Sequence, residues 1–253
     1  MAKNNHLEEN NQKKLDSLLR HSGSALPTDV YNDAIKYAES IAGIENCVAV
    51  VSNLVENRSR IIAGKFADLL NLSDYDNENS IWEKKILDLM TEEERQEKYI
   101  AELRFYHFLK RIVPSKRDEY YLMSQLRFRL QNKRFMDIQH RMYYMYDESK
   151  KHIIAAICLY SPLTFSHSGK SYVVNSITGI YEELTNSNSN AVLSQRECQV
   201  LSLIEKGMKS REIAETLNIS IHTVNRHRQS ILESLQVKNS YEACRIAKSM
   251  SLI

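Results

Sequence analysis

Apolar positions in residues 193–250 recur at helical spacing, and residues that start or stop helices divide them into short segments. Ser194 and Glu197 have the spacing of a capping box, and Gly207 supplies a left-handed stop after the first apolar stripe. A second helix is expected after Ser210. It should end at Asn218, which tolerates the positive φ of a tight turn.

Two further helices are predicted from the same kind of signal. Ser220 is expected to cap a third helix that runs to about Leu235, and Ser240 to cap a fourth over residues 241–250. Each apolar face is too narrow to fold alone, because a short helix is stable in water only when that face is packed. The four helices are therefore expected to share one core.

The third of these helices separates apolar and polar side chains. Val224, Ile231 and Leu235 fall on its inward side when successive residues are about 100° apart. The outward side and its flanks collect His222, Asn225, Arg226, Gln229 and Ser230. Arg and Gln can form paired hydrogen bonds with guanine and adenine in the major groove. The alternative is an ordinary solvated face, which periodicity alone favours.

The first 185 residues alternate between helical and strand periods. Helical patterns are expected at 30–44, 65–70, 81–90 and 92–112. Alternating or continuous apolar patterns predict strands at 48–51, 61–62, 126–130, 138–146, 152–160, 172–174 and 180–181. Two strands, then helices, then three strands and a small hairpin indicate an α+β domain.

A polar run at 185–190 has no apolar residue to bury and is interpreted as a linker. The polar N-terminus is interpreted as a tail. The expected organisation is a tail and leading helix at 1–45, a sheet domain at 46–184, a linker at 185–191 and a helical domain at 192–253.

Charge and composition narrow the function. The chain has net charge +2, and residues 190–253 carry nine Lys and Arg against six Asp and Glu, where a phosphate-facing surface would need them. The four cysteines have no metal-ligand spacing and are interpreted as small core residues. No long apolar run or secretion signal is present, so a cytoplasmic protein without membrane contact is expected. No catalytic residue set is found, and neither an enzyme, a metal nor a cofactor is expected.

The C-terminal segment closely resembles the LuxR-type (GerE-like) helix-turn-helix in its helices, turns and spacing. The positions that match are Leu193, Arg196, Glu197, Val200, Leu201, Gly207, Glu212, Ile213, Ala214, Leu217, Ser220, Thr223, Val224, His227, Ile231, Leu235 and Val237. The resemblance implies an all-α four-helix domain whose third helix enters the major groove of double-stranded DNA.

The resemblance also implies which residues contact DNA. The base-facing positions correspond to Asn225, Arg226 and Gln229. Candidate contacts to the sugar–phosphate backbone are Lys209, Ser210, Arg211, Ser220, Thr223, Arg228, Lys238 and Asn239. Two positions depart from the family. Asn225 stands where Lys is usual, which favours an adenine contact. Arg228 stands where an apolar residue is usual, and either a phosphate or a carboxylate could be its partner.

Residues 46–162 resemble a PAS domain in the order of their strands and helices. That resemblance implies a five-stranded antiparallel sheet with helices over one face, used for sensing and dimerisation. His107 could ligate haem, but a partly buried structural histidine is the favoured interpretation. The residues 51–54 lack the acidic pair that a phospho-receiver domain needs.

Together these patterns predict a sequence-specific DNA-binding transcription regulator, a homodimer controlled by a signal or partner at the PAS-like domain. RNA polymerase is a further candidate partner, and the ligand of the PAS-like domain is unknown. The alternative is an interaction or dimerisation protein whose PAS-like domain docks a partner without binding a small ligand. A third hypothesis is a sensor whose ligand gates DNA affinity.

Overall fold

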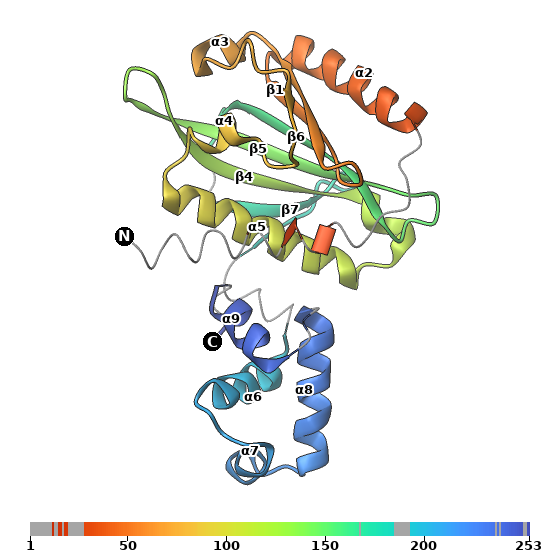
Figure 1. The fold of residues 1–253 in the computed structure, drawn as a ribbon, viewed down its shortest axis with the longest axis vertical. Coiled ribbons are helices and arrows are strands. Elements are labelled where there is room, and N and C mark those ends of the chain that lie inside the picture. Colours follow the sequence, from red (N-terminus) through yellow and green to blue (C-terminus); the bar gives the residue numbers. More distant parts are fainter. Residues whose placement is uncertain are drawn as a thin grey trace.

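The computed structural model describes residues 12, 15, 16, 18, 19, 28–166, 168–184, 193–235, 237, 239–249 and 252–253. A sheet with covering helices precedes a group of short helices at the C-terminus (Figure 1). The predicted linker lies outside the described residues.

Eight strands in the described part of the chain form one antiparallel sheet in the order β3-β2-β1-β6-β5-β4-β7-β8. Their bounds are β1 Val48–Asn53, β2 Arg58–Ala63, β3 Asn77–Glu78, β4 Tyr120–Arg129, β5 Phe135–Tyr146, β6 Ile153–Pro162, β7 Ser171–Asn175 and β8 Tyr181–Glu183. The predicted fold class, an α+β sheet domain followed by an all-α helical domain, is confirmed.

The helices fall into two groups. Those of the sheet domain are α2 Thr28–Glu45, α3 Phe66–Leu70, α4 Lys84–Leu87, α5 Glu92–Arg111 and a 3₁₀ helix, Pro114–Glu119. Those of the C-terminal domain are α6 Gln195–Glu205, α7 Ser210–Leu217, α8 Ile221–Leu235 and α9 Ser240–Ser249. None of the helices in the described part of the chain has the length and apolar character needed to span a membrane.

The two faces of the sheet are covered by different helices, because successive strand residues point to opposite sides. On β1, Ala49 and Val51 pack with the leading helix α2, through Ala38 and Ala42 among others. The alternate residues of β1, Val48 and Val50, join the larger core. That core also contains these residues of α5: Tyr99, Ala101, Leu103, Phe105, Tyr106 and Leu109. Helix α5 therefore lies on the inner face and α2 on the outer face.

The boundaries of β4 and α4 differ clearly from those expected. Strand β4 begins at Tyr120 rather than at 126, because its first residues pair with β7. Strands β7 and β8 form the predicted hairpin, which extends the same sheet through the pairing of β7 with β4. Helix α4 is shorter than 81–90, since the amides of Ile81 and Trp82 donate to the side chains of Asn57 and Ser80 instead.

The buried apolar residues of the C-terminal helices pack together, as their narrow apolar faces require. Its fully buried residues include Val200, Leu201, Ile213, Val224, Ile231, Leu235, Ala243, Ile246 and Ala247. The predicted capping box of Ser194 and Glu197 and the left-handed Gly207 are present. The predicted cap of α9 is wrong: Asn239 accepts from the amide of Glu242, and Ser240 is the first helical residue. Both residue types cap well, so local sequence could not separate them.

Candidate functional site

The turn between helices α7 and α8 is stabilised by the backbone conformation and hydrogen bonds of its own residues. Asn218 has a left-handed φ of 52°, and the amide of Ile219 bonds back to the carbonyl of Ala214. The hydroxyl of Ser220 then accepts from the amide of Thr223 at 3.0 Å and caps α8. The turn and the cap together determine where α8 begins relative to α7.

Helix α8 separates its residues as predicted. Val224, Ile231 and Leu235 are buried, whereas Asn225, Arg226 and Gln229 are exposed on the other side. The side-chain amide of Gln229 donates to the carboxylate of Glu233 at 3.1 Å. That hydrogen bond must break before Gln229 can donate the same proton to a base. The three predicted base-reading residues therefore lie together on one solvent-facing surface.

The predicted backbone contacts surround that surface to different degrees. Lys209, Arg211, Ser220 and Asn239 are exposed, while Ser210, Thr223 and Arg228 are half-buried. Lys238 lies outside the described residues. Arg228 donates to the hydroxyl of Ser240 at 3.1 Å, so in this structure it ties α8 to α9. This hydroxyl is not the carboxylate that was one expected partner, and a contact of Arg228 with a phosphate stays a prediction.

Sequence reasoning missed how firmly α6 holds the helix-turn-helix. The hydroxyl of Ser230 on α8 donates to Glu197 at 2.5 Å, and Arg196 donates to the carbonyl of Leu217 at the end of α7 at 2.6 Å. Burial raises the pKa of Glu197, but hydrogen bonds from Ser230 and Ser194 outweigh it, and the net shift is downward. Glu197 is therefore held as a carboxylate between the two helices.

The apolar residues of α9 are already used inside the domain. Ala243, Ile246 and Ala247 are buried in the core, so these residues of α9 do not form an exposed surface for dimerisation. Tyr241 is 78% exposed instead, and it lines a groove of about 470 Å³ between α6 and α9.

A second group of polar residues is buried in the sheet domain. On α5, the Lys98 ammonium lies 2.5 Å from the carboxylate of Glu102, and both residues are 3% exposed. Burial raises the pKa of Glu83, and the Ser52 hydroxyl donates to its carboxylate at 3.5 Å. Burial lowers the pKa of Lys98, but the carboxylates of Glu102 and Glu83 outweigh it, so that pKa is raised. The interior therefore holds a compensated set of charges.

His140 on β5 lies in the same interior. It is fully buried, and neither ring nitrogen has a hydrogen-bond partner. Its ring stacks on Tyr160 of β6, with centroids 4.8 Å apart. Burial, and then the Lys98 charge, hold the pKa of His140 well below its usual value, so the imidazole is neutral. The alternation of residues 138–146 predicted an inward face for His140, but not its charged neighbours.

Two other features have structural explanations. His107 is buried on α5, edge-on to Tyr106, as the structural interpretation expects. No group of His, Cys, Asp and Glu side chains in the described part of the chain could hold a metal ion.

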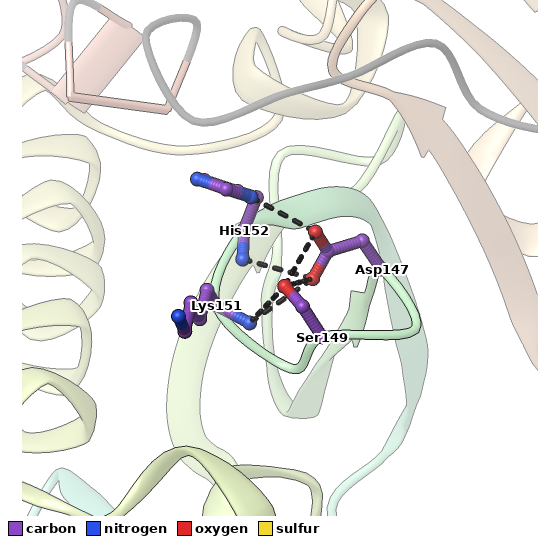
Figure 2. A network of polar contacts seen from close by, with 4 residues as sticks. All are labelled: Asp147, Ser149, Lys151 and His152. Atoms are coloured by element: carbon purple, nitrogen blue, oxygen red, sulfur yellow. Dashed lines mark hydrogen bonds and ion pairs between the residues drawn. The ribbon is translucent and has the colours of Figure 1, made fainter.

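Figure 2 shows Asp147 accepting from the amides of Lys151 and His152, from the His152 ring and from Ser149. These bonds close the turn between β5 and β6.

The comparisons with known proteins agree with the geometry of α6–α9. The family model described as "Bacterial regulatory proteins, luxR family" matches residues 191–247. The oxygen regulatory protein NreC of Staphylococcus aureus (strain JH9) is 33% identical over 97 residues, which cover 34% of this chain and 45% of that protein. The chain thus spans less than half the length of the curated relatives it matches.

Among solved structures, a VqmA dimer of Vibrio cholerae covers 87% of this chain and 88% of its own, at 14% identity and a TM-score of 0.32. SdiA of Escherichia coli covers 96% and 98%, at 15% identity and a TM-score of 0.26. The match to the family model, the cap and turn geometry and the exposed polar face of α8 lead to one conclusion: this chain carries a LuxR-type helix-turn-helix DNA-binding domain at its C-terminus.

Proposed function

We propose that this chain is a transcription regulator that binds specific sequences of duplex DNA by inserting α8 into the major groove. The observation that carries the proposal is the joint exposure of Asn225, Arg226 and Gln229 on one face of α8. These side chains can form paired hydrogen bonds with adenine and guanine edges. Lys209 and Arg211 lie at the start of α7, where phosphates are often contacted, and the sequence adds Lys238 to the proposed backbone contacts.

The domain that precedes α6 is proposed to be a PAS-like sensory and dimerisation module. The central strands of its sheet follow the order β2-β1-β6-β5-β4, with α5 over the inner face. The order of these five strands supports the proposal. The predicted five-stranded sheet with helices over one face is corrected in two respects: β3, β7 and β8 extend the sheet, and α2 covers its outer face. The predicted boundaries, 46–184 for this module and 192–253 for the DNA-binding domain, stay predictions.

The chain is further proposed to act as a homodimer, held mainly through residues 1–185. One LuxR-type domain offers one reading helix, and symmetric pairs reading two half-sites are the common route to tight specific binding. The outer face of the sheet supports this proposal. Tyr121 and Tyr143 stack there at 4.9 Å, close to the exposed Tyr37 of α2, and aromatic residues are enriched in protein interfaces.

The signal that controls the regulator is proposed to act on the sheet domain. The buried group around Lys98, Glu102 and His140 is the candidate sensing region, because polar atoms without partners in a protein interior are costly unless something binds them. In the alternative function, the sheet domain docks a partner and binds no small ligand. RNA polymerase remains a candidate partner of the DNA-bound form. We also propose that the protein is located in the cytoplasm.

The test is selection of DNA from a random duplex library by the purified full-length chain, without added ligand. The proposal predicts a selected site, for which affinity exceeds that for random DNA by a factor of about 10³ or more. Uniform affinity for all sequences would contradict it. A selected site that appears only when cell extract is supplied would favour control by a small ligand or partner.

A further inference from the structure

Strand β8 is the last strand of the sheet domain, and helix α5 contacts the residue that follows it. Leu184 is the last described residue before the DNA-binding domain begins at Leu193. The amide of Leu184 donates to the carbonyl of Ser171 at 2.8 Å. Its carbonyl accepts from the Arg104 guanidinium of α5 at 3.1 Å. The backbone at the start of the linker is therefore tied both to β7 and to α5.

A second contact links α5 to the segment before β7. The Lys170 ammonium forms ion pairs with Glu97, and with Glu94 at 3.8 Å. Between the two contacts lies an open groove of about 390 Å³, lined by Ile100 and Ala101 of α5 among others. The exit strand is thus held to α5 by directional polar bonds at the rim of a groove. Such a contact can change its geometry at lower cost than a close-packed apolar one.

The same helix carries the buried charges on another face. Lys98 and Glu102 point into the interior, whereas Glu97 and Arg104 face the groove. At about 100° per residue, the two faces are roughly a third of a turn apart on one continuous helix. A helix of this length moves largely as a unit, so a shift forced by the interior would displace Arg104 relative to Leu184.

We propose that the bond from Arg104 to the Leu184 carbonyl is a latch that passes the state of the sheet-domain interior to the linker and so to the DNA-binding domain. The inference rests on the proposed function, because it assigns a regulatory role to a contact between the sensing and DNA-binding parts. Arg104 is a positioning residue in this account. It is not among the residues proposed to contact DNA, and it lies on the groove side of α5 rather than on the side of Lys98 and Glu102.

The experiment compares three variants of the full-length chain by amide hydrogen exchange and by affinity for the selected DNA site. Arg104→Ala removes the latch, and Arg104→Lys keeps one donor. Arg117→Ala is the matched control, because Arg117 also donates to a backbone carbonyl, that of Ile112, but lies away from β8. Thermal unfolding of each variant checks that it is folded.

Arg104→Ala is expected to speed amide exchange at residues 181–184 about tenfold, the factor that loss of one hydrogen bond to a charged group allows. It should also change affinity for the selected site by at least about fivefold, the lower end of typical allosteric couplings. Arg104→Lys should restore part of both effects, and Arg117→Ala should show neither.

A double-mutant cycle supplies the link to the interior. Replacing the buried pair by Lys98→Met with Glu102→Leu keeps volume and removes both charges, a change that buried pairs often tolerate. It should alter DNA affinity in the wild-type background and not in the Arg104→Ala background. Equal effects in both backgrounds would overturn the latch.

Measuring amide hydrogen exchange tests the latch independently of DNA binding, so failure of the latch can be distinguished from failure of the proposed function. Unchanged exchange at 181–184 in Arg104→Ala overturns the latch, whatever the chain binds. Faster exchange with unchanged DNA affinity leaves Arg104 a purely structural tie and also overturns the regulatory role. A wild-type chain that selects no DNA site would instead contradict the proposed function, and the exchange result would still report on the contact.

Discussion

Ser230 of α8 donates a 2.5 Å hydrogen bond to Glu197, which also completes the capping box at the start of α6. One carboxylate therefore stabilises the first turn of α6 and also holds α8 against it. Glu197 occupies a family position, and its part in holding α8 is structural rather than a DNA contact.

Glu197→Ala is expected to lower the free energy of unfolding of the C-terminal domain by about 2 kcal/mol. It removes a helix cap and leaves the Ser230 hydroxyl without its partner. Thermal unfolding of the full chain, followed by a probe in residues 193–249, would measure the loss. Glu215→Ala is the control, since Glu215 is exposed and its pair with Arg211 should contribute less than about 1 kcal/mol. Equal losses in the two variants would refute the role assigned to Glu197.

Lys238 is expected to contact a phosphate. Lys238→Ala should lower DNA affinity about uniformly across sequences and reduce the slope of log affinity against log salt by about one. Titrations of the selected site and of random DNA at several salt concentrations measure both quantities. An unchanged salt slope would remove Lys238 from the backbone contacts.

His140→Phe is expected to leave the ligand-free protein as stable as the wild type or to stabilise it by about 1 kcal/mol. The change keeps an aromatic ring and removes two buried nitrogens that have no partners. Because the pKa of His140 is lowered in the fold, the unfolded chain binds more protons below about pH 6.5. The advantage of the variant should therefore grow as the pH falls from 7 toward 5.

Denaturant unfolding at several pH values tests the assignment of His140. Its control is His152→Phe, which removes the exposed contact with Asp147 and should not stabilise. A clear loss of stability in His140→Phe at pH 7 would show that the imidazole nitrogens have partners in solution.

The dimer is expected to depend on the sheet domain. The full chain should sediment as a dimer, and residues 190–253 alone should be monomeric at micromolar concentration. Tyr37→Glu places a charge on the exposed side of α2 and should weaken the dimer, whereas Tyr241→Glu on α9 should not. Dissociation by Tyr241→Glu alone would move the interface to α9, and a monomeric full chain would refute the proposed dimer.

The sequence predicted the C-terminal domain well because its signals are local. Caps, turns and apolar spacing within about four residues decide each helix. The errors are shifts of one residue: α7 begins at Ser210 rather than after it, and Asn239 rather than Ser240 caps α9. The buried pair of Lys98 and Glu102 could not be predicted in the same way. At i and i+4 on a helix it is typical of a solvated surface, and only packing of α5 on the sheet shows that it is buried.

The hydrogen-bond partner of Arg228 also could not be predicted from the sequence. A hydroxyl twelve residues away is brought near only by the packing of α8 on α9. Strand β4 starts early for a similar reason, because its first residues are held by β7, a strand much later in the chain. In each case the deciding contact is between elements that are distant in sequence.

The central claim is that the exposed face of α8 reads bases, and Arg226→Ala and Gln229→Ala test it most directly. Each variant would be titrated against the selected site and against random duplex DNA, with Arg245→Ala, exposed on α9, as the control for lost charge. We expect each variant to lose about 1–3 kcal/mol on the selected site, with little change on random DNA and a relaxed base preference. Equal losses on the two DNAs would show that these residues contact only the backbone, and would contradict the claim.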